Sequence, residues 1–336
     1  MDEIQPPSSM KILIIRLSSI GDIVLTTPVI RAVKEQFPNA SLHFLVKKSM
    51  KDVLAYNPHI DRLHLYDQNT KEELFRELAA EKFDTVVDLQ NNHRSRQLCR
   101  RIKISPLRLR KLNFKKWVCV RLKVNFMPDV HIVNRYFETV RMLSVYNDHK
   151  GLEFHIPASG VFDEDDFPMV FEDGFVAIVM AGAHATKRIP ADKVIEIGRI
   201  LRRPVMLLGG EDVKKAAQEV EDALGDRAYN GCGKYTLYQT ASILQQADCI
   251  ITGDTGLMHI AAAFQKPIAV LWGNTIPEFG MYPYMPGLRT SFRNFEVVPL
   301  HCRPCSKLGY KKCPRKHFKC MRKISSIEVA EWVNKF

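Results

Sequence analysis

The sequence predicts an α/β protein of two domains, each with a mostly parallel sheet. Short apolar runs alternate with helical segments from residue 11 to residue 89, and the alternation resumes after residue 174. Apolar runs that alternate with helices are typical of buried strands in parallel sheets. An acidic, proline-containing stretch at 153–173 separates the two series, and 336 residues are enough for two cores.

In the first half of the chain, Lys11–Arg16 is almost wholly apolar and predicts a central strand of a parallel sheet. A small-residue loop at 17–22 follows, and then a helix to about Phe37 whose apolar residues recur at the spacing of one helical face. Pro28 falls in its first turns, where proline is tolerated. The other elements expected here are strands at 42–46, 62–66 and 85–89 and helices at 49–56, 71–80 and 131–145.

The second half repeats this pattern. The expected strands are 175–180, 204–208, 248–252 and 267–272, and the expected helices are 191–201, 212–224, 237–246, a segment ending near 263, and 325–336. Two Rossmann-like halves imply a cleft between domains, with ligands at the carboxyl ends of the strands. The domains expected are a disordered tail (1–9), an N-terminal Rossmann-like domain (10–157), a C-terminal Rossmann-like domain (158–324) and a C-terminal helix (325–336).

The bulk composition is that of a soluble globular protein, with 46% hydrophobic and 26% charged residues. No apolar run is long enough to span a bilayer. The first ten residues are polar, acidic and proline-rich, unlike a signal peptide, so a cytoplasmic protein with reduced thiols is expected.

The positive charge is unevenly distributed. The formal charge is +12, with twelve Lys and Arg and no acid in 93–123, and nine and no acid in 301–323. Two acid-free blocks favour a surface for nucleic acid, anionic membrane or a phosphorylated substrate over a merely solvated basic face. No RNA- or DNA-binding motif accompanies them and they have few aromatic residues for base stacking, so nucleic acid is the least favoured partner.

Residues 253–263, G-D-T-G-L-M-H-I-A-A-A, lie between two apolar runs that predict buried strands. Asp254, Thr255 and Gly256 combine a capping-type residue, a hydroxyl and a glycine that lets the backbone approach a ligand. Free N–H groups and the positive end of the helix dipole make such a helix start an anion site. His259 lies four residues after Thr255, on the same helical face. The motif alone fits an anion site and an ordinary capped joint with a core histidine equally well.

Asp22 follows the first strand in S-S-I-G-D, at the edge of the sheet where ligands bind. A carboxylate there can accept a proton from a substrate hydroxyl, and Gly21 allows close approach of the backbone. The local pattern by itself favours the alternative that Asp22 caps the following helix.

The segment 181–190, A-G-A-H-A-T-K-R-I-P, places small residues and then cations after a strand. It suits a phosphate cradle with Lys187 or Arg188 as the counter-charge, and Pro190 is expected in the first turn of the next helix. Glu211, after another strand, either bonds a ribose diol or is a solvated charge at a helix start. No glycine cluster matches the P-loop or the dinucleotide fingerprint.

Half of the eight cysteines cluster late in the chain with the spacing C-x2-C-x7-C-x6-C. The first pair has zinc-like spacing, but the second lacks the compact spacing of a zinc ribbon. Structural zinc, redox thiols and plain packing all remain open for these residues. They are Cys302, Cys305, Cys313 and Cys320.

Three ordered segments together resemble glycosyltransferase family 9, the bacterial lipopolysaccharide heptosyltransferases. They are K-I-L-I-I-R-L-S-S-I-G-D-I-V-L-T-T-P-V-I, G-A-H-A-T-K-R-I-P, and G-D-T-G-L-M-H-I-A-A-A followed by P-I-A-V-L-W-G. The resemblance covers nearly the whole chain after the tail. It implies a GT-B fold of two facing Rossmann-like domains, with the acceptor on the N-terminal domain and the nucleotide-sugar on the C-terminal one. It also implies inverting, metal-independent transfer of a heptose-like sugar from a nucleotide diphosphate such as ADP-heptose to a lipopolysaccharide core acceptor.

The same resemblance implies a role for each matching residue. Asp22 would be the general base, and Lys187 would neutralise the departing diphosphate. The backbone of Asp254, Thr255 and Gly256 would hold the pyrophosphate with His259 behind it, and Glu211 would face the ribose. Gly182, Ala183 and Thr186 would line the donor site, and Ser18, Ser19, Gly21, Arg94 and Arg96 the acceptor site.

Two departures from the family pattern leave the donor sugar open. Gly182-Ala183 stands where some heptosyltransferases carry paired threonines, and Arg188-Ile189-Pro190 replaces the more usual basic-Trp-Pro. The alternatives are a family 9-like transferase that uses another nucleotide-sugar for O-antigen or capsule, and a non-catalytic nucleotide- or nucleic-acid-binding protein.

A lipopolysaccharide core acceptor is polyanionic and lies on the inner leaflet. The basic block at 94–123 would steer the enzyme to that membrane, at roughly 1 kcal/mol per well-placed cation. Peripheral contact with the anionic inner membrane is therefore expected. Phe114, Trp117, Val118 and Phe126 either add apolar contact there or pack the N-terminal domain.

Overall fold

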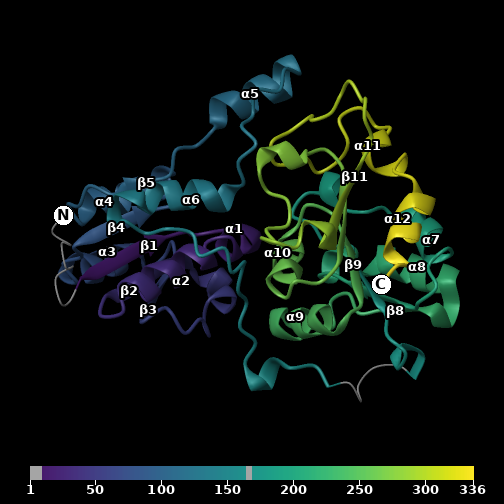
Figure 1. Ribbon diagram of the computed structural model, residues 1–336, viewed down its shortest axis with the longest axis horizontal. Helices are drawn as coiled ribbons and strands as arrows, with labels where there is room; N and C mark the ends of the chain where they lie inside the picture. The colour runs from purple at the N-terminus through teal and green to yellow at the C-terminus, as the bar shows by residue number, and fades with distance from the viewer. Residues whose placement is uncertain (1–9, 164–168) are drawn as a thin grey trace. The chain divides into compact units, whose positions relative to one another are not determined.

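The computed structural model describes residues 10–163 and 169–336 (Figure 1). The tail expected at 1–9 lies outside the described residues. Contacts divide the chain into two units: the first contains the described residues up to Lys111 and Val130–His155, and the second contains Leu112–Asp129 and Ile156–Phe336. The second unit therefore includes 112–129, which the sequence analysis grouped with the N-terminal domain. Each unit is built on one parallel sheet.

The first unit contains a sheet that is parallel throughout. Its strands are β1 (Lys11–Ile15), β2 (Ser41–Lys47), β3 (Arg62–Tyr66), β4 (Thr85–Asp88) and β5 (Leu107–Arg108). Their order is β3-β2-β1-β4-β5, so β1 is central, as its apolar sequence predicted. β1 pairs with β4 so that Ile15 lies opposite Asp88, and the two strands end at the same edge of the sheet.

The helix expected after β1 is two helices. The helical elements of this unit are α1 (Ile20–Val24), α2 (Thr27–Gln36), η1 (Lys48–Val53), α3 (Lys71–Ala80), α4 (His93–Arg101), α6 (Ile132–Val140) and η2 (Arg141–Leu143). The prediction of one helix was wrong because Pro28 has no N–H and its ring would clash with the carbonyl of Val24 in a continuous helix. Pro28 instead stands in the first turn of α2, where it is tolerated.

The second unit contains a longer parallel sheet. Its strands are β6 (Val176–Val179), β7 (Val205–Leu208), β8 (Ala228–Asn230), β9 (Cys249–Thr252), β10 (Ile268–Trp272) and β11 (Phe292–Glu296). Their order is β11-β10-β9-β6-β7-β8. The four apolar runs expected as strands are its central members. β8 and β11 were not predicted because they are the edge strands: β8 has only three residues, and β11 is mostly half-buried and contains polar residues.

The second unit contains the following helical elements. They are α5 (Asn113–Leu122), η3 (Ala158–Gly160), η5 (Met169–Phe171), η6 (Ala185–Lys187), α7 (Ala191–Gly198), η7 (Glu211–Val213), α8 (Lys214–Leu224), η8 (Gly225–Arg227), α9 (Leu237–Gln246), α10 (Gly256–Ala263), η9 (Pro277–Phe279), η10 (Arg289–Ser291), α11 (Lys319–Arg322) and α12 (Ser326–Val333). α7, α8 and α12 pack on one face around Ile178 and Leu207. The expected C-terminal helix is confirmed as α12, where the hydroxyl of Ser325 accepts from Glu328 N at 3.2 Å. Within the described ranges, no helix has both the length and the apolarity needed to cross a bilayer.

Candidate active site

Sheet topology brings Lys187 and Asp254 together. β6 and β9 are neighbours, with Val179 opposite Thr252, so the loops after them leave the sheet at one edge. Lys187, in the first loop, lies with its Nζ 2.6 Å from Oδ2 of Asp254 in the second loop. Both side chains are partly exposed, at 17% and 12%. Two residues that the sequence analysis singled out in separate motifs therefore form one ion pair at the carboxyl ends of the strands.

A third loop at the same edge also contacts Asp254. It follows β10, the other neighbour of β9, and its Thr275 donates a hydrogen bond to Asp254 Oδ2 at 2.9 Å. Arg303 fixes this loop by donating to the carbonyls of Gly273 and Thr275, both at 2.9 Å. The sequence analysis missed both residues. Thr275 lies just past a predicted strand and could have been found from that position, whereas nothing in the sequence connects Arg303 to this edge.

Thr255, and not Asp254, occupies the N-cap position of α10. Its hydroxyl accepts from Met258 N at 3.3 Å and lies 3.1 Å from the hydroxyl of Thr252. The expectation that Asp254 is the capping-type residue is corrected here: the threonine bonds the helix N–H, which leaves the carboxylate to meet Lys187. His259 is 2% exposed in α10 and belongs to the packed interior of the unit.

The loop that carries Lys187 lies directly on the ends of β9 and β10. A Cβ at Gly253 would collide with the carbonyl oxygen of Lys187, and a Cβ at Gly273 would stand 2.7 Å from that of Thr186. Glycine is therefore required at both positions for the backbones to approach this closely. The two glycines set how near Lys187 can come to the start of α10.

Thr186 ties this loop to the C-terminal basic segment. It is 2% exposed, and its hydroxyl accepts from Tyr310 N at 2.8 Å. Gly182 accepts from Arg188 Nε at 2.9 Å through its carbonyl, and Ala183 is exposed. Arg188 also pairs with Asp212, so it is held on the side of β7. Pro190 precedes α7 at the N-cap position, one residue before its expected place in the first turn.

Glu211 stands after β7, at the same edge of the sheet. Its side chain is 71% exposed and lies 3.1 Å from Lys214, three residues on in the chain. An exposed pair of this kind contributes little to stability. The glutamate is therefore accessible to a ligand that reaches this part of the edge.

In the first unit, Asp22 is held by three groups. Its Oδ1 lies 2.5 Å from Nη2 of Arg16, and its Oδ2 accepts from Ser19 N at 3.1 Å and from Ser19 Oγ at 2.8 Å. Asp22 belongs to α1, which begins at Ile20, so the expected loop at 17–22 is shorter than predicted. The carboxylate bonds the backbone of the N-cap residue Ser19, yet 24% of the side chain stays exposed. It can therefore serve the helix start and still meet a substrate.

Arg16 is the main anchor of Asp22, and the sequence analysis did not place it in the site. It is 8% exposed, donates to the carbonyl of Leu89 at 2.6 Å and lies 5.9 Å from the ring centre of Tyr136. Burial disfavours the charged form of Arg16. The attraction of Asp22, Tyr136 and Asp88 outweighs this effect, so the pKa of Arg16 is raised. The sequence did contain a signal for this role, because Arg16 is a charged residue directly after the apolar run 12–15.

The expected acceptor residues lie on the loops after β1 and β4. The backbone of Ser18 donates weakly to the side chain of Gln90 at 3.4 Å, and Gly21 is buried in α1. Arg94 and Arg96 are exposed in α4, which starts just past β4, and Arg96 Nε donates to Asn91 at 3.0 Å. β1 and β4 are adjacent, so both loops share the edge that holds Asp22.

The four late cysteines are free thiols gathered in one cluster. Burial, together with the neighbouring thiols of Cys305, Cys313 and Cys302, raises the pKa of Cys320 to about 12. Sγ of Cys302 lies 3.8 Å from His317 Nε2. In the described part of the chain, no group of three or more His, Cys, Asp or Glu is arranged to hold a metal ion.

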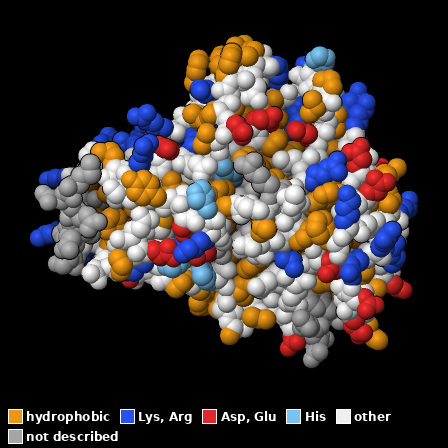
Figure 2. All heavy atoms as spheres, viewed as in Figure 1, with side chains coloured by type: hydrophobic (Ala, Val, Ile, Leu, Met, Phe, Trp, Pro, Cys, Tyr) orange, Lys and Arg blue, Asp and Glu red, His pale blue; other side chains and the backbone are white. Residues whose placement is uncertain are grey.

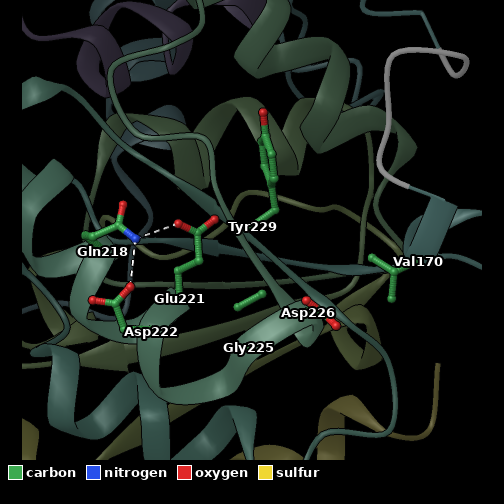
Figure 3. Close-up of a pocket in the computed structure, with 8 residues that line it drawn as sticks. Val170, Gln218, Glu221, Asp222, Gly225, Asp226 and Tyr229 are labelled. Carbon is green, nitrogen blue, oxygen red and sulfur yellow. Dashed lines mark hydrogen bonds between the residues drawn. The ribbon is translucent and has the colours of Figure 1, made fainter.

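A hollow of about 590 Å³ lies elsewhere in the second unit, beside α8 and β8 (Figure 3). Its lining includes Glu221, Asp222 and Asp226, and the first two accept from Gln218 at 2.8 and 2.9 Å. No residue expected in the site lines it. Three carboxylates would repel a diphosphate, so this hollow is not the donor site.

Two parallel sheets of Rossmann order, with the candidate site residues at the carboxyl ends of the strands, define a two-domain α/β protein of the type that commonly binds nucleotides. Residues 72–311 match the model of the family described as "Glycosyltransferase family 9 (heptosyltransferase)". This match spans well over half of the chain, so the protein belongs to glycosyltransferase family 9. The resemblance found from the sequence is confirmed, and the chain is a glycosyltransferase.

Characterised relatives cover most of the chain at low identity. Lipopolysaccharide heptosyltransferase 1 of Campylobacter coli is 25% identical over 289 residues, which are 79% of this chain and 84% of the relative. Lipooligosaccharide heptosyltransferase 2 of Haemophilus influenzae is 23% identical over 306 residues, 80% of this chain and 85% of the relative.

Solved structures share the fold. Glycosyl transferase family 9 from Veillonella parvula has a TM-score of 0.76 at 21% identity, covering 97% of this chain and 96% of that one. E. coli heptosyltransferase WaaC with ADP-2-deoxy-2-fluoro heptose has a TM-score of 0.64 at 17% identity, covering 97% and 99%. The iron-containing dodecameric glycosyltransferase TibC of enterotoxigenic E. coli has a TM-score of 0.56 at 15% identity, covering 97% and 78%. These likenesses confirm the GT-B fold class.

Proposed function

We propose that this glycosyltransferase moves a heptose from ADP-heptose to a lipopolysaccharide core acceptor, with inversion and without a catalytic metal. The observation that carries the proposal is the pairing of Lys187 with Asp254 at the start of α10. A cation beside a helix N-terminus is the arrangement that a nucleotide diphosphate requires. The relatives named as heptosyltransferases and the WaaC structure with an ADP-heptose analogue support this donor.

Asp22 is the proposed general base. Its carboxylate accepts the proton of the acceptor hydroxyl while that oxygen forms a bond to the anomeric carbon of the donor. The bond from the anomeric carbon to the diphosphate oxygen breaks at the same time, and ADP leaves with the electron pair. Arg16 and Ser19 hold the carboxylate in one orientation, which suits a base that must meet one particular hydroxyl.

Lys187 and the start of α10 are proposed to stabilise the negative charge that develops on the departing diphosphate. Lys187 Nζ, now 2.6 Å from Asp254, needs only a small movement to meet a phosphate oxygen beside that helix. The first N–H groups of α10 supply further donors around Thr255 and Gly256. Fixed positive charge of this kind takes the place of a metal. The exposed Glu211 is proposed to bond the ribose.

The acceptor is proposed to bind the first unit, where Arg94 and Arg96 would meet its acidic groups beside Asp22. An anionic, lipid-linked acceptor places the enzyme at the cytoplasmic face of the inner membrane, in peripheral contact with it. A different nucleotide-sugar is the second candidate, because Gly182-Ala183 and Arg188 depart from the family pattern.

The test is a panel of ADP-heptose, UDP-sugars, GDP-sugars and single-stranded RNA, measured first by thermal shift and then by transfer to a heptose-free core acceptor. We expect ADP-heptose to stabilise the protein most and to support transfer. If only a UDP- or GDP-sugar stabilises the protein and supports transfer, that sugar is the donor in place of ADP-heptose. Stabilisation by RNA alone, with no sugar transferred, would overturn the proposal.

A further inference from the structure

Helix α5 is fixed to the second unit by one of its faces. Cys119 packs with Ile276 and Phe279, and the Lys116 ammonium lies 5.1 Å from the ring centre of Phe279. At the end of the helix, Lys123 Nζ donates to the carbonyls of Val120 and Pro304, at 2.7 and 2.6 Å. These contacts set the rotation of α5 about its axis.

Other large apolar side chains of α5 project into solvent. Phe114 is 76% exposed, Trp117 51% and Leu122 60%, and the first two rings stack with centres 6.2 Å apart. Phe126, just past the helix, is 64% exposed. We call these four residues the outward face of α5. Of the two alternatives left open by the sequence, packing into a core therefore applies only to Val118, which is 8% exposed.

The surroundings of the outward face are basic. Lys115 and Arg121 are exposed on the same helix, and the sequence has no acid between Asp88 and Asp129. The bond from Lys123 to Pro304 joins α5 to the second acid-free block, 301–323. Glu278, from another element, acts on the thiol of Cys119, which packs against the second unit. Figure 2 shows hydrophobic side chains gathered over α5, with Lys and Arg beside them and Asp and Glu below.

We propose that the outward face of α5 inserts into the interfacial region of an anionic lipid bilayer. Trp and Phe partition into this region, and flanking Lys and Arg bind anionic headgroups. A helix that is attached to the protein and also bears exposed aromatic and basic residues would lie in the plane of the membrane. This inference deepens the peripheral contact suggested under the proposed function, but it needs neither donor nor acceptor.

Trp117 provides a direct readout. The chain has three tryptophans, and the other two, Trp272 and Trp332, are 0% and 8% exposed. A blue shift of tryptophan emission on adding vesicles would therefore come from Trp117. We expect this shift with phosphatidylcholine vesicles that contain phosphatidylglycerol, together with quenching by lipids brominated on their acyl chains.

Vesicle sedimentation of the full chain, without nucleotide-sugar, tests the surface by mutation. We expect the double variant Phe114→Ser, Trp117→Ser to lower the partition coefficient at least about tenfold. Lys115→Gln and Arg121→Gln should each lower it about fivefold, and only for anionic vesicles. The control Tyr146→Ser, Met169→Ser removes side chains of 63% and 82% exposure outside the basic blocks and should bind as the wild type does.

Unchanged binding by the Phe114, Trp117 double variant would overturn the proposal. A second result would also overturn it: the wild type is a dimer, the double variant is a monomer, and neither binds vesicles. A second copy of the chain would then cover the outward face of α5. Circular dichroism and thermal unfolding establish that the variants are folded. Transfer to a soluble, delipidated acceptor separates the two proposals. We expect the double variant to retain this transfer, because the reaction needs no membrane, and its absence in the wild type would count against the proposed function alone.

Discussion

The Nζ of Lys187 lies 2.6 Å from a carboxylate oxygen of Asp254, on a loop that follows the neighbouring strand. The cation expected at the diphosphate is thus already held at the start of α10. The two side chains are 17% and 12% exposed, and the pair lies where we propose that the diphosphate binds.

Loss of the Lys187 charge should impair transfer more than folding. We expect Lys187→Gln to lower kcat/KM for the donor by about 10²-fold or more, because the departing diphosphate loses its counter-charge. Steady-state kinetics with the active donor measure this. Lys215→Gln, which removes an exposed charge from α8, is the matched control and should change kcat/KM less than twofold. Equal effects from the two variants would take Lys187 out of the site.

Asp22→Asn should separate catalysis from binding. The amide keeps the shape of the carboxylate but cannot accept the proton, so we expect kcat to fall by about 10²- to 10⁴-fold. The Kd for ADP, measured by calorimetry, should stay within about twofold, because Asp22 belongs to the first unit and the residues proposed to bind the nucleotide belong to the second.

Ser19→Ala is the comparison for Asp22. It removes one hydrogen bond, the 2.8 Å contact from Ser19 Oγ, and leaves Arg16 in place. A milder loss of kcat is expected from this variant than from Asp22→Asn. Full turnover by Asp22→Asn would remove Asp22 from the role of base.

Gly253→Ala should push the Lys187 loop away from β9. The new methyl group would collide with the carbonyl oxygen of Lys187, and overpacking of this kind costs about 1–3 kcal/mol. We expect lower thermal stability and weaker binding of ADP. Gly210→Ala is the control, since its methyl would meet only the end of the Asp212 side chain, at 2.9 Å. A Gly253→Ala protein with wild-type stability and affinity would show that the loop is not closely packed there.

The strand ends could be located from the sequence because the central strands are apolar runs with clear limits. Lys187 and Asp254 were found in this way, and the parallel order of β6 and β9 then brings them together. Arg303 and Tyr310 could not be found, because they reach the site from a segment without regular periodicity, through bonds that span 28 and 124 residues. Hydrogen bonds from Arg303 to the carbonyls of Gly273 and Thr275 require no particular residue types near Arg303, so they leave no pattern in the local sequence.

Two further elements could not be predicted from local sequence: helix α5, and the break between α1 and α2. Lysines interrupt the apolar residues of α5, so the sequence of the basic block gives no regular apolar spacing from which the bounds of this helix could be predicted. The break after Val24 follows from Pro28, which the sequence analysis noted but placed in the start of one longer helix. A proline marks a helix start only when the residues before it are assigned to another element.

A buried histidine pair should make the first unit sensitive to acid. His43 and His64 are 4% and 3% exposed, with Nδ1 of the first 2.9 Å from Nε2 of the second. Burial lowers the pKa of His64 to about 4, and His43 acts in the same direction. Its ordinary pKa, near 6.5, applies in the unfolded chain. Because the folded pKa is the lower one, stability is full above about pH 6.5 and is lost as the pH falls toward 4.

Hydrogen exchange of the amides of β2 and β3 measures this effect in the first unit by itself. Between pH 7.5 and 5, after correction for intrinsic exchange rates, we expect the opening free energy to fall by about 1–2 kcal/mol in the wild type. His64→Gln keeps a polar partner for His43 but does not titrate, so its opening free energy should be lower at pH 7.5 and should change less with pH. If both proteins lose stability in parallel as the pH falls, the protons responsible are taken up by other groups.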